Sequence, residues 1–264
     1  MAKICVLRME GTNCEWETFL AFKRLKGDVE FVHIKQILRE SEEDRFLGDY
    51  ACVIIPGGFS SGDYVRAGAI FASRLSKLKK EIIEFIEEDK LLGGICNGFQ
   101  VLVELGVLPG IGAALSEEKK AALTVNDSNL FECRPTLLRH VNGGKCIFTR
   151  RYARDKIVVF PSAHAEGKLV FRDEDILEKM IENDQIVFRY TDSKGDYAGY
   201  PWNPNGSIYN IAGICNERGN VFGLMPHPER VFYSYTHPDW TRNYRGVYGD
   251  GMSLFKSILD YIDK

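Results

Sequence analysis

A sharp glycine-flanked turn around Cys96 is the feature that most constrains the fold of this chain. The sequence Gly94-Ile95-Cys96-Asn97-Gly98 follows an apolar run (residues 91–95) and precedes a helix-like segment. A Gly-x-Cys-x-Gly turn between strand and helix has the form of a nucleophile elbow, whose crowded backbone needs glycine on both sides. The thiol then lies at a strand's carboxyl end and at a helix N-terminus, whose partial positive charge favours thiolate. The turn therefore predicts an α/β sheet with a nucleophilic cysteine at its edge.

The first hundred residues alternate between strand and helix patterns. Thr12 and Glu15 have capping-box spacing, which predicts a helix from there to about Leu25. A second helix carries an apolar stripe over residues 75–86, with lysine and glutamate off the stripe. Strands are predicted at 4–7, 29–33, 51–55 and 91–95. This alternation predicts a doubly wound, mostly parallel sheet flanked by helices.

The pattern changes after Pro109 to short strands. They are predicted at 122–125, 136–138, 146–148, 156–160, 186–190, 211–215 and 221–225. A hairpin-type turn at 217–220 joins the last two, and a helix over 253–262 closes the chain. We expect a single domain over residues 1–264, with a β-rich second half wrapped onto the α/β half. Residues 117–120 and 195–206 are expected to be exposed loops.

Composition and cysteine usage exclude several classes of protein. The net charge of −3 and pI near 6.0 give no reason to expect nucleic acid or an anionic membrane as a partner. No apolar stretch is long enough to span a bilayer, and no signal-peptide pattern is visible. The seven cysteines are odd in number and include no Cys-x-x-Cys, so we expect reduced thiols, no metal site and a cytoplasmic location.

His227 and Glu229 are the best candidates to act with the thiol. A cysteine nucleophile needs a base to take and return a proton, and the base needs an orienting partner. His227 stands in Met225-Pro226-His227-Pro228-Glu229, directly after an apolar strand. Glu229 lies two residues on, so both side chains point the same way on an extended segment. We predict a triad of Cys96, His227 and Glu229.

The reaction also needs donors for an oxyanion. The N–H of Asn97, which follows the nucleophile, is the usual donor at such an elbow. Pro56-Gly57-Gly58-Phe59 ends another predicted strand, and its glycines let backbone N–H groups approach a ligand closely. Gly58 or Phe59 is therefore predicted as the second donor.

These residues together resemble class I glutamine amidotransferases, whose glutaminase domains have a flavodoxin-like sheet and a Cys-His-Glu triad. Within that family, the resemblance narrows to glutaminase subunits that serve purine biosynthesis. The stretches that carry it are Gly11-Thr12-Asn13-Cys14-Glu15, residues 56–64, residues 94–100, Asn203-Pro204-Asn205-Gly206-Ser207 and residues 225–230. It covers nearly the whole chain, with Ala165 as a departure in the stretch 164–167.

The resemblance implies hydrolysis of glutamine to glutamate and ammonia. Gln100 and Gly57 are then expected to help bind the substrate, and Arg134 to face a carboxylate or a partner subunit. His164 and Glu166 are expected at the rim, against the substrate or the partner.

The ammonia is expected to pass to a large ATP-dependent synthase subunit, often with a small bridging subunit. That synthase converts formylglycinamide ribonucleotide to formylglycinamidine ribonucleotide. ATP and magnesium belong to the partner, and no cofactor is expected in this chain.

Three alternatives stay open at this point. The chain could be the glutaminase subunit of another class I amidotransferase, although Asn203–Ser207 argues against it. It could be a different cysteine enzyme on a similar sheet, such as a cysteine peptidase, although His227-x-Glu229 after a late strand favours an amidotransferase. It could also be a regulatory domain with a degenerate site, against which the complete triad speaks.

Overall fold

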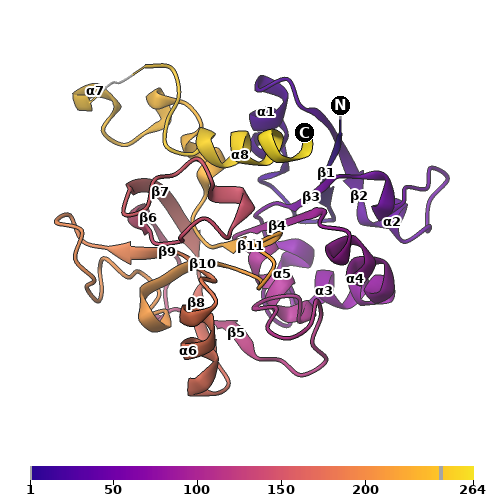
Figure 1. Ribbon diagram of the computed structural model, residues 1–264, viewed down its shortest axis with the longest axis horizontal. Helices are drawn as coiled ribbons and strands as arrows, with labels where there is room; N and C mark the ends of the chain where they lie inside the picture. The colour runs from indigo at the N-terminus through magenta and orange to yellow at the C-terminus, as the bar shows by residue number, and fades with distance from the viewer. Residues whose placement is uncertain (1, 244–245) are drawn as a thin grey trace.

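A nine-stranded mixed sheet forms the centre of the protein in the computed structural model, which describes residues 2–243 and 246–264. The strand order is β2-β1-β3-β4-β11-β10-β9-β6-β7, with a separate two-stranded sheet formed by β5 and β8 (Figure 1). The strands are β1 (Lys3–Arg8), β2 (Asp28–His33), β3 (Cys52–Ile55), β4 (Leu91–Ile95), β5 (Ala121–Thr124), β6 (Glu132–His140), β7 (Ile157–His164), β8 (Lys168–Phe171), β9 (Ile186–Thr191), β10 (Ile211–Cys215) and β11 (Val221–Leu224).

Helices cover both faces of the sheet. Helix α1 (Glu15–Arg24) and α8 (Met252–Ile262) lie together on one face, while α3 (Ala69–Leu75), α4 (Lys79–Glu87) and α5 (Asn97–Leu105) lie on the other (Figure 1). The remaining helices are short or peripheral: α2 (Ile34–Ile37), α6 (Glu174–Glu182) and α7 (Trp240–Asn243). The prediction of a mostly parallel sheet flanked by helices is confirmed.

The strand sequences explain why the sheet has two cores. Successive residues of a strand point to opposite faces. In β3 the side chains of Val53 and Ile55 join the core under α3, α4 and α5, whereas Cys52 and Ile54 join the core under α1 and α8. A strand buried on both faces has to be apolar at every position, which is why β3 reads as a continuous apolar run.

The second half of the chain extends the same sheet instead of wrapping around it. Strand β11 pairs parallel with β4 and antiparallel with β10, which joins β9, β6 and β7 in antiparallel order. The return of β11 to β4 is what brings the segment after residue 224 beside the elbow. The predicted hairpin at 217–220 is confirmed.

Some local predictions are wrong. Residues 146–148 do not form a strand, because Ile147–Thr149 is a 3₁₀ turn; a run this short carries no periodicity to distinguish the two. The capping box at Thr12 does not form: Cys14 is the N-cap, and the Thr12 hydroxyl accepts from the N–H of Met9. Strand β8 and helix α6 were not anticipated; only Ile176 and Met180 of α6 are buried, so its apolar stripe is narrow.

Candidate active site

The backbone at Cys96 has the strained form that the elbow pattern predicts. Cys96 has φ +52° and ψ −106° between β4 and α5. A Cβ added at Gly94 would lie 2.4 Å from the carbonyl oxygen of Gly98, and one at Gly98 would lie 1.9 Å from that of Ile55. Side chains do not fit at either position, so the two glycines are a packing requirement of the turn.

Four strand ends converge on this point. The loops after β1, β3, β4 and β11 supply Cys14, Gly57, Cys96 and His227, respectively. A Cβ added at Gly57 would lie 2.7 Å from His227 Cε1 and 3.3 Å from both Cys14 Sγ and Cys96 Cβ. Gly57 therefore marks the place where Cys14, Cys96 and His227 meet, at the carboxyl edge of the parallel strands.

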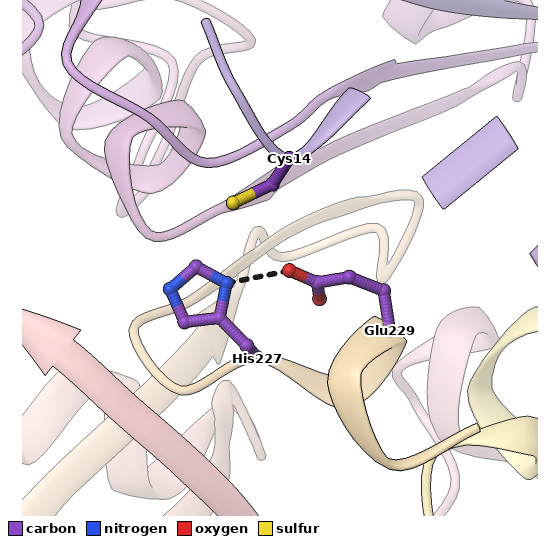
Figure 2. Close-up of side chains that lie close together, drawn as sticks. All are labelled: Cys14, His227 and Glu229. Carbon is purple, nitrogen blue, oxygen red and sulfur yellow. Dashed lines mark hydrogen bonds and ion pairs between the residues drawn. The ribbon is translucent and has the colours of Figure 1, made fainter. Parts of the chain in front are cut away.

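His227 and Glu229 form a buried dyad. The Nδ1–H of His227 donates to Glu229 Oε1 at 2.5 Å, and the two residues are 1% and 5% exposed (Figure 2). Burial alone would lower the pKa of His227, but the charges of Glu229 and Cys96 raise the pKa well above its ordinary value. Glu229 thus fixes the tautomer and orientation of the ring and favours its protonated form.

The Cys96 thiol and Nε2 of His227 are not hydrogen-bonded to each other. Cys96 Sγ donates to the carbonyl oxygen of Ala163 at 3.6 Å. His227 Nε2 is buried and finds no hydrogen-bond partner among the residues that the structure describes. Nucleophile–base hydrogen bonds are often loose without substrate and tighten in the reacting complex.

The geometry separates the two candidates for the second oxyanion donor. The N–H of Phe59 donates to the carbonyl oxygen of Gly11 at 2.9 Å, so the prediction that Phe59 could serve as donor is not supported. For Gly58 and Asn97, neither backbone N–H has an acceptor within the described part of the chain. The free donors are therefore those of Gly58 and Asn97, beside the elbow.

Cys14 is a site residue that sequence reasoning missed. Its thiol faces the dyad (Figure 2), and Cys14, His227 and Glu229 each bring one ligand-type atom within 4.8 Å of the others. Arg230 donates to Cys14 Sγ at 3.1 Å. The available signal was its place in the loop after β1, because the carboxyl ends of adjacent parallel strands meet at one edge.

Gln100 and Arg134 have other contacts than those expected of substrate ligands. The Gln100 amide accepts from Asn97 Nδ2 at 3.0 Å and donates to the carbonyl oxygen of Glu166 at 2.7 Å. The Arg134 guanidinium pairs with Glu132 and donates to the hydroxyl of Tyr200 at 2.9 Å. Gln100 therefore borders the site through its neighbours, and Arg134 is held by contacts outside the dyad and the elbow.

His164 is a core residue, which corrects the expected place at the rim. It is 2% exposed, and its Nδ1 lies 3.2 Å from Asn126 Oδ1. Asn205 Nδ2 lies 3.5 Å from its Nε2, and Asn205 Oδ1 accepts from the N–H and the hydroxyl of Ser207. The stretch Asn203–Ser207 was expected to lie partly in an exposed loop. It is instead buried behind the site, where Asn205 contacts His164.

Comparison with known proteins agrees with this geometry. Residues 1–262 match the family described as the CobB/CobQ-like glutamine amidotransferase domain. The chain is 56% identical to the phosphoribosylformylglycinamidine synthase subunit PurQ of Archaeoglobus fulgidus, over 99% of this chain and 97% of that one. It is 50% identical to the protein of the same name from Picrophilus torridus, over 90% of each.

Solved structures show the same similarity. A chain in the structure of PurLQS from Thermotoga maritima superposes with a TM-score of 0.74 at 33% identity, over 99% of this chain and all of that one. A glutamine amidotransferase from the same organism superposes at 0.55 with 14% identity, which supports the fold alone. Within residues 2–243 and 246–264, no helix is long and apolar enough to cross a membrane.

Proposed function

The chain belongs to the CobB/CobQ-like glutamine amidotransferase family, and from this premise we propose that it is the glutaminase subunit of phosphoribosylformylglycinamidine synthase. It hydrolyses glutamine to glutamate and ammonia, and the ammonia serves the conversion of formylglycinamide ribonucleotide to formylglycinamidine ribonucleotide in purine biosynthesis. The observation that carries the chemistry is the convergence of Cys96, at the elbow, and the buried dyad on Gly57.

The site residues divide the reaction between them. The Cys96 thiolate attacks the side-chain amide carbon of glutamine, and the N–H groups of Gly58 and Asn97 receive the charge that develops on the oxygen. His227, held protonated beside Glu229, gives its proton to the departing ammonia. The neutral ring then takes a proton from water, which attacks the glutamyl thioester and releases glutamate.

We propose that this reaction needs no metal or other cofactor in the chain. The thiol supplies the nucleophile, and Nδ1 of His227 is already bonded to Glu229. Side chains of the protein can therefore carry out every step of the reaction. ATP and magnesium are assigned to the synthase partner. Chelation by EDTA should therefore leave glutamate formation by the assembled enzyme unchanged when no ATP-dependent step is measured.

A partner subunit would dock beside the elbow, where ammonia leaves. Exposed apolar side chains gather on the loops that border it: Phe59 and Phe131 have ring centroids 6.1 Å apart, and Tyr64, Val65 and Leu130 are 66–81% exposed. An apolar patch beside a catalytic loop suits a protein interface. We assign it to the ATP-dependent synthase subunit, with a small bridging subunit as a further component, in the cytoplasm where purine precursors are made.

Two thiols beside one imidazole make the identity of the nucleophile a direct test. In the complex with the synthase subunit, Cys96→Ala should lower glutamine hydrolysis by at least about 1,000-fold and abolish covalent labelling by 6-diazo-5-oxo-norleucine. Ammonia-dependent synthesis by the partner should persist. Cys133, an exposed free cysteine, provides the matched control in Cys133→Ala.

The variant Cys14→Ala separates the two readings of the site. It should keep covalent labelling, because Cys14 lies outside the elbow. If Cys14→Ala lost the label and Cys96→Ala retained it, the nucleophile would be Cys14 and the mechanism above would be wrong.

A further inference from the structure

Three buried side chains beside the elbow offer the donor atoms of a metal site. Cys14 comes from the loop after β1, whereas His227 and Glu229 follow β11. One ligand-type atom of each lies within 4.8 Å of the other two, and all three residues are at most 5% exposed (Figure 2). The lack of a Cys-x-x-Cys spacing does not exclude this site, because its ligands come from loops far apart in the chain.

Two contacts at this cluster point to a positive ligand. Oε1 of Glu229 accepts from Nδ1 of His227 at 2.5 Å, but Oε2 is buried and has no hydrogen-bond partner within the described residues. Buried carboxylate oxygens are normally satisfied. The sulfur of Cys14 already accepts from the guanidinium of Arg230 at 3.1 Å, so it faces a cation on one side. A second cation, between the sulfur and the carboxylate, would satisfy the unpartnered oxygen as well.

The donor types select zinc among the common divalent cations. Zinc binds cysteine sulfur, histidine nitrogen and carboxylate oxygen in tetrahedral geometry, whereas magnesium and calcium prefer oxygen ligands. At bond lengths of about 2.0–2.3 Å, two ligand atoms of a tetrahedral zinc lie roughly 3.3–3.8 Å apart. Nδ1 and Oε1 would have to separate by about 1 Å to admit the ion, and an atom pair at the 4.8 Å limit would have to close by about the same amount.

We propose that Cys14, His227 and Glu229 bind Zn²⁺ and that the bound ion inhibits glutamine hydrolysis, a consequence that rests on the proposed function. Glu229 meets the ring at Nδ1, so the metal replaces the proton that Nδ1 now donates. A ring that holds a metal on one nitrogen keeps its proton on the other. Nε2 of His227 then neither gives a proton to ammonia nor takes one from water. The ion opposes the reaction, so it is not a cofactor.

Direct binding to the full chain is the first test, because it needs no turnover. Competition with a chromophoric chelator should show one Zn²⁺ per chain, and Co²⁺ should give a thiolate-to-metal charge-transfer band. Cys14→Ala should weaken Zn²⁺ binding by at least about 100-fold and abolish the band, since loss of an outer-shell partner alone costs 10- to 100-fold. Cys96→Ala and the exposed control Cys133→Ala should keep both. If Cys14→Ala failed to fold, Cys14→Ser, which is closer in size, would take its place.

Inhibition is the second test, in the complex with the synthase subunit. Zn²⁺ should stop glutamate release by the parent complex, and EDTA should restore it. The Zn²⁺ concentration that halves the rate, measured against each complex's own zinc-free rate, should rise by at least about 100-fold in Cys14→Ala. It should not change in Cys133→Ala, and excess Mg²⁺ should not relieve the inhibition, because magnesium does not compete for a sulfur ligand.

Two results would overturn the assignment. If Cys96→Ala lost Zn²⁺ binding while Cys14→Ala kept it, the ion would lie at the elbow thiol instead. A parent chain without the thiolate band, or without any bound Zn²⁺, would mean that the three ligands do not act together. Failure of the proposed function is distinguishable, because the chain would then bind Zn²⁺ as described and the zinc-free complex would release no glutamate.

Discussion

Gly57→Ala should separate catalysis from folding in this protein. The added Cβ would lie 2.7 Å from His227 Cε1, whereas ordinary contacts of a Cβ begin near 3.4 Å, so the ring has to move by about 0.7 Å. Nδ1 remains bonded to Glu229, so much of this movement falls on Nε2, the atom that meets the thiol. Since a misplacement of about 1 Å costs roughly 100-fold in rate, we expect kcat to fall roughly 10- to 100-fold.

The fold should survive this change. Gly57 does not have the left-handed backbone conformation that only glycine adopts readily, so the penalty is overpacking of about 1–3 kcal/mol. Glutamate release by the complex with the synthase subunit would be measured alongside thermal unfolding of the chain. Gly48→Ala is the matched control, because no heavy atom lies within 4 Å of its added Cβ. A folded Gly57→Ala variant with kcat within twofold of the parent would refute the placement of the imidazole.

Three further outcomes are expected. Glu229→Gln removes the charge that raises the pKa of His227, so the alkaline limb of the pH–rate profile should move to lower pH while kcat falls by about 100-fold or more; an unmoved limb would contradict the role of the dyad. Asn205→Ala leaves the N–H of Ser207 and Nε2 of His164 without partners, so the free energy of unfolding should fall by about 2–4 kcal/mol. Chemical denaturation would measure this loss, with Lys194→Ala as the surface control. Burial and the charge of His227 lower the pKa of His164 to about 4; an unfolded chain takes up this proton near pH 6.5, so His164 should destabilise the fold progressively as pH falls from 6.5 to 4, by up to about 3 kcal/mol. In His164→Gln the melting temperature should fall less over this pH range. A dependence of melting temperature on pH equal to the parent's would count against this role of His164.

The local pattern around each strand was enough to predict the parallel half of the sheet. Continuous apolar runs identify β3 and β4, because strands buried on both faces leave no polar positions. The elbow at Cys96 was also predictable, since only glycine fits at positions 94 and 98 of such a turn. The conformation of residues 146–148 was not predictable. These residues have the composition of a strand, but their burial comes from packing around a 3₁₀ turn.

Contacts between distant loops lay beyond the sequence pattern. In the sequence, Cys14 resembles any other small apolar residue. Only the pairing of β1 with β3 shows that the thiol of Cys14 faces the dyad. The sequence does not distinguish Phe59 from Gly58 as the second oxyanion donor. The hydrogen bond from the Phe59 N–H to the carbonyl oxygen of Gly11 does. His164 was expected at the rim from the resemblance, yet in the structure Asn126 and Asn205 hold its ring in the interior.

The sequence by itself determined the nucleophile's turn, the dyad's spacing and the alternation of strands, because each depends on residues within a few positions of one another. The tertiary structure decided which N–H groups stay free and that a second thiol, that of Cys14, lies beside the imidazole. Those properties depend on distances between strand ends that are tens to hundreds of residues apart in the chain, and only the order of strands in the sheet sets them.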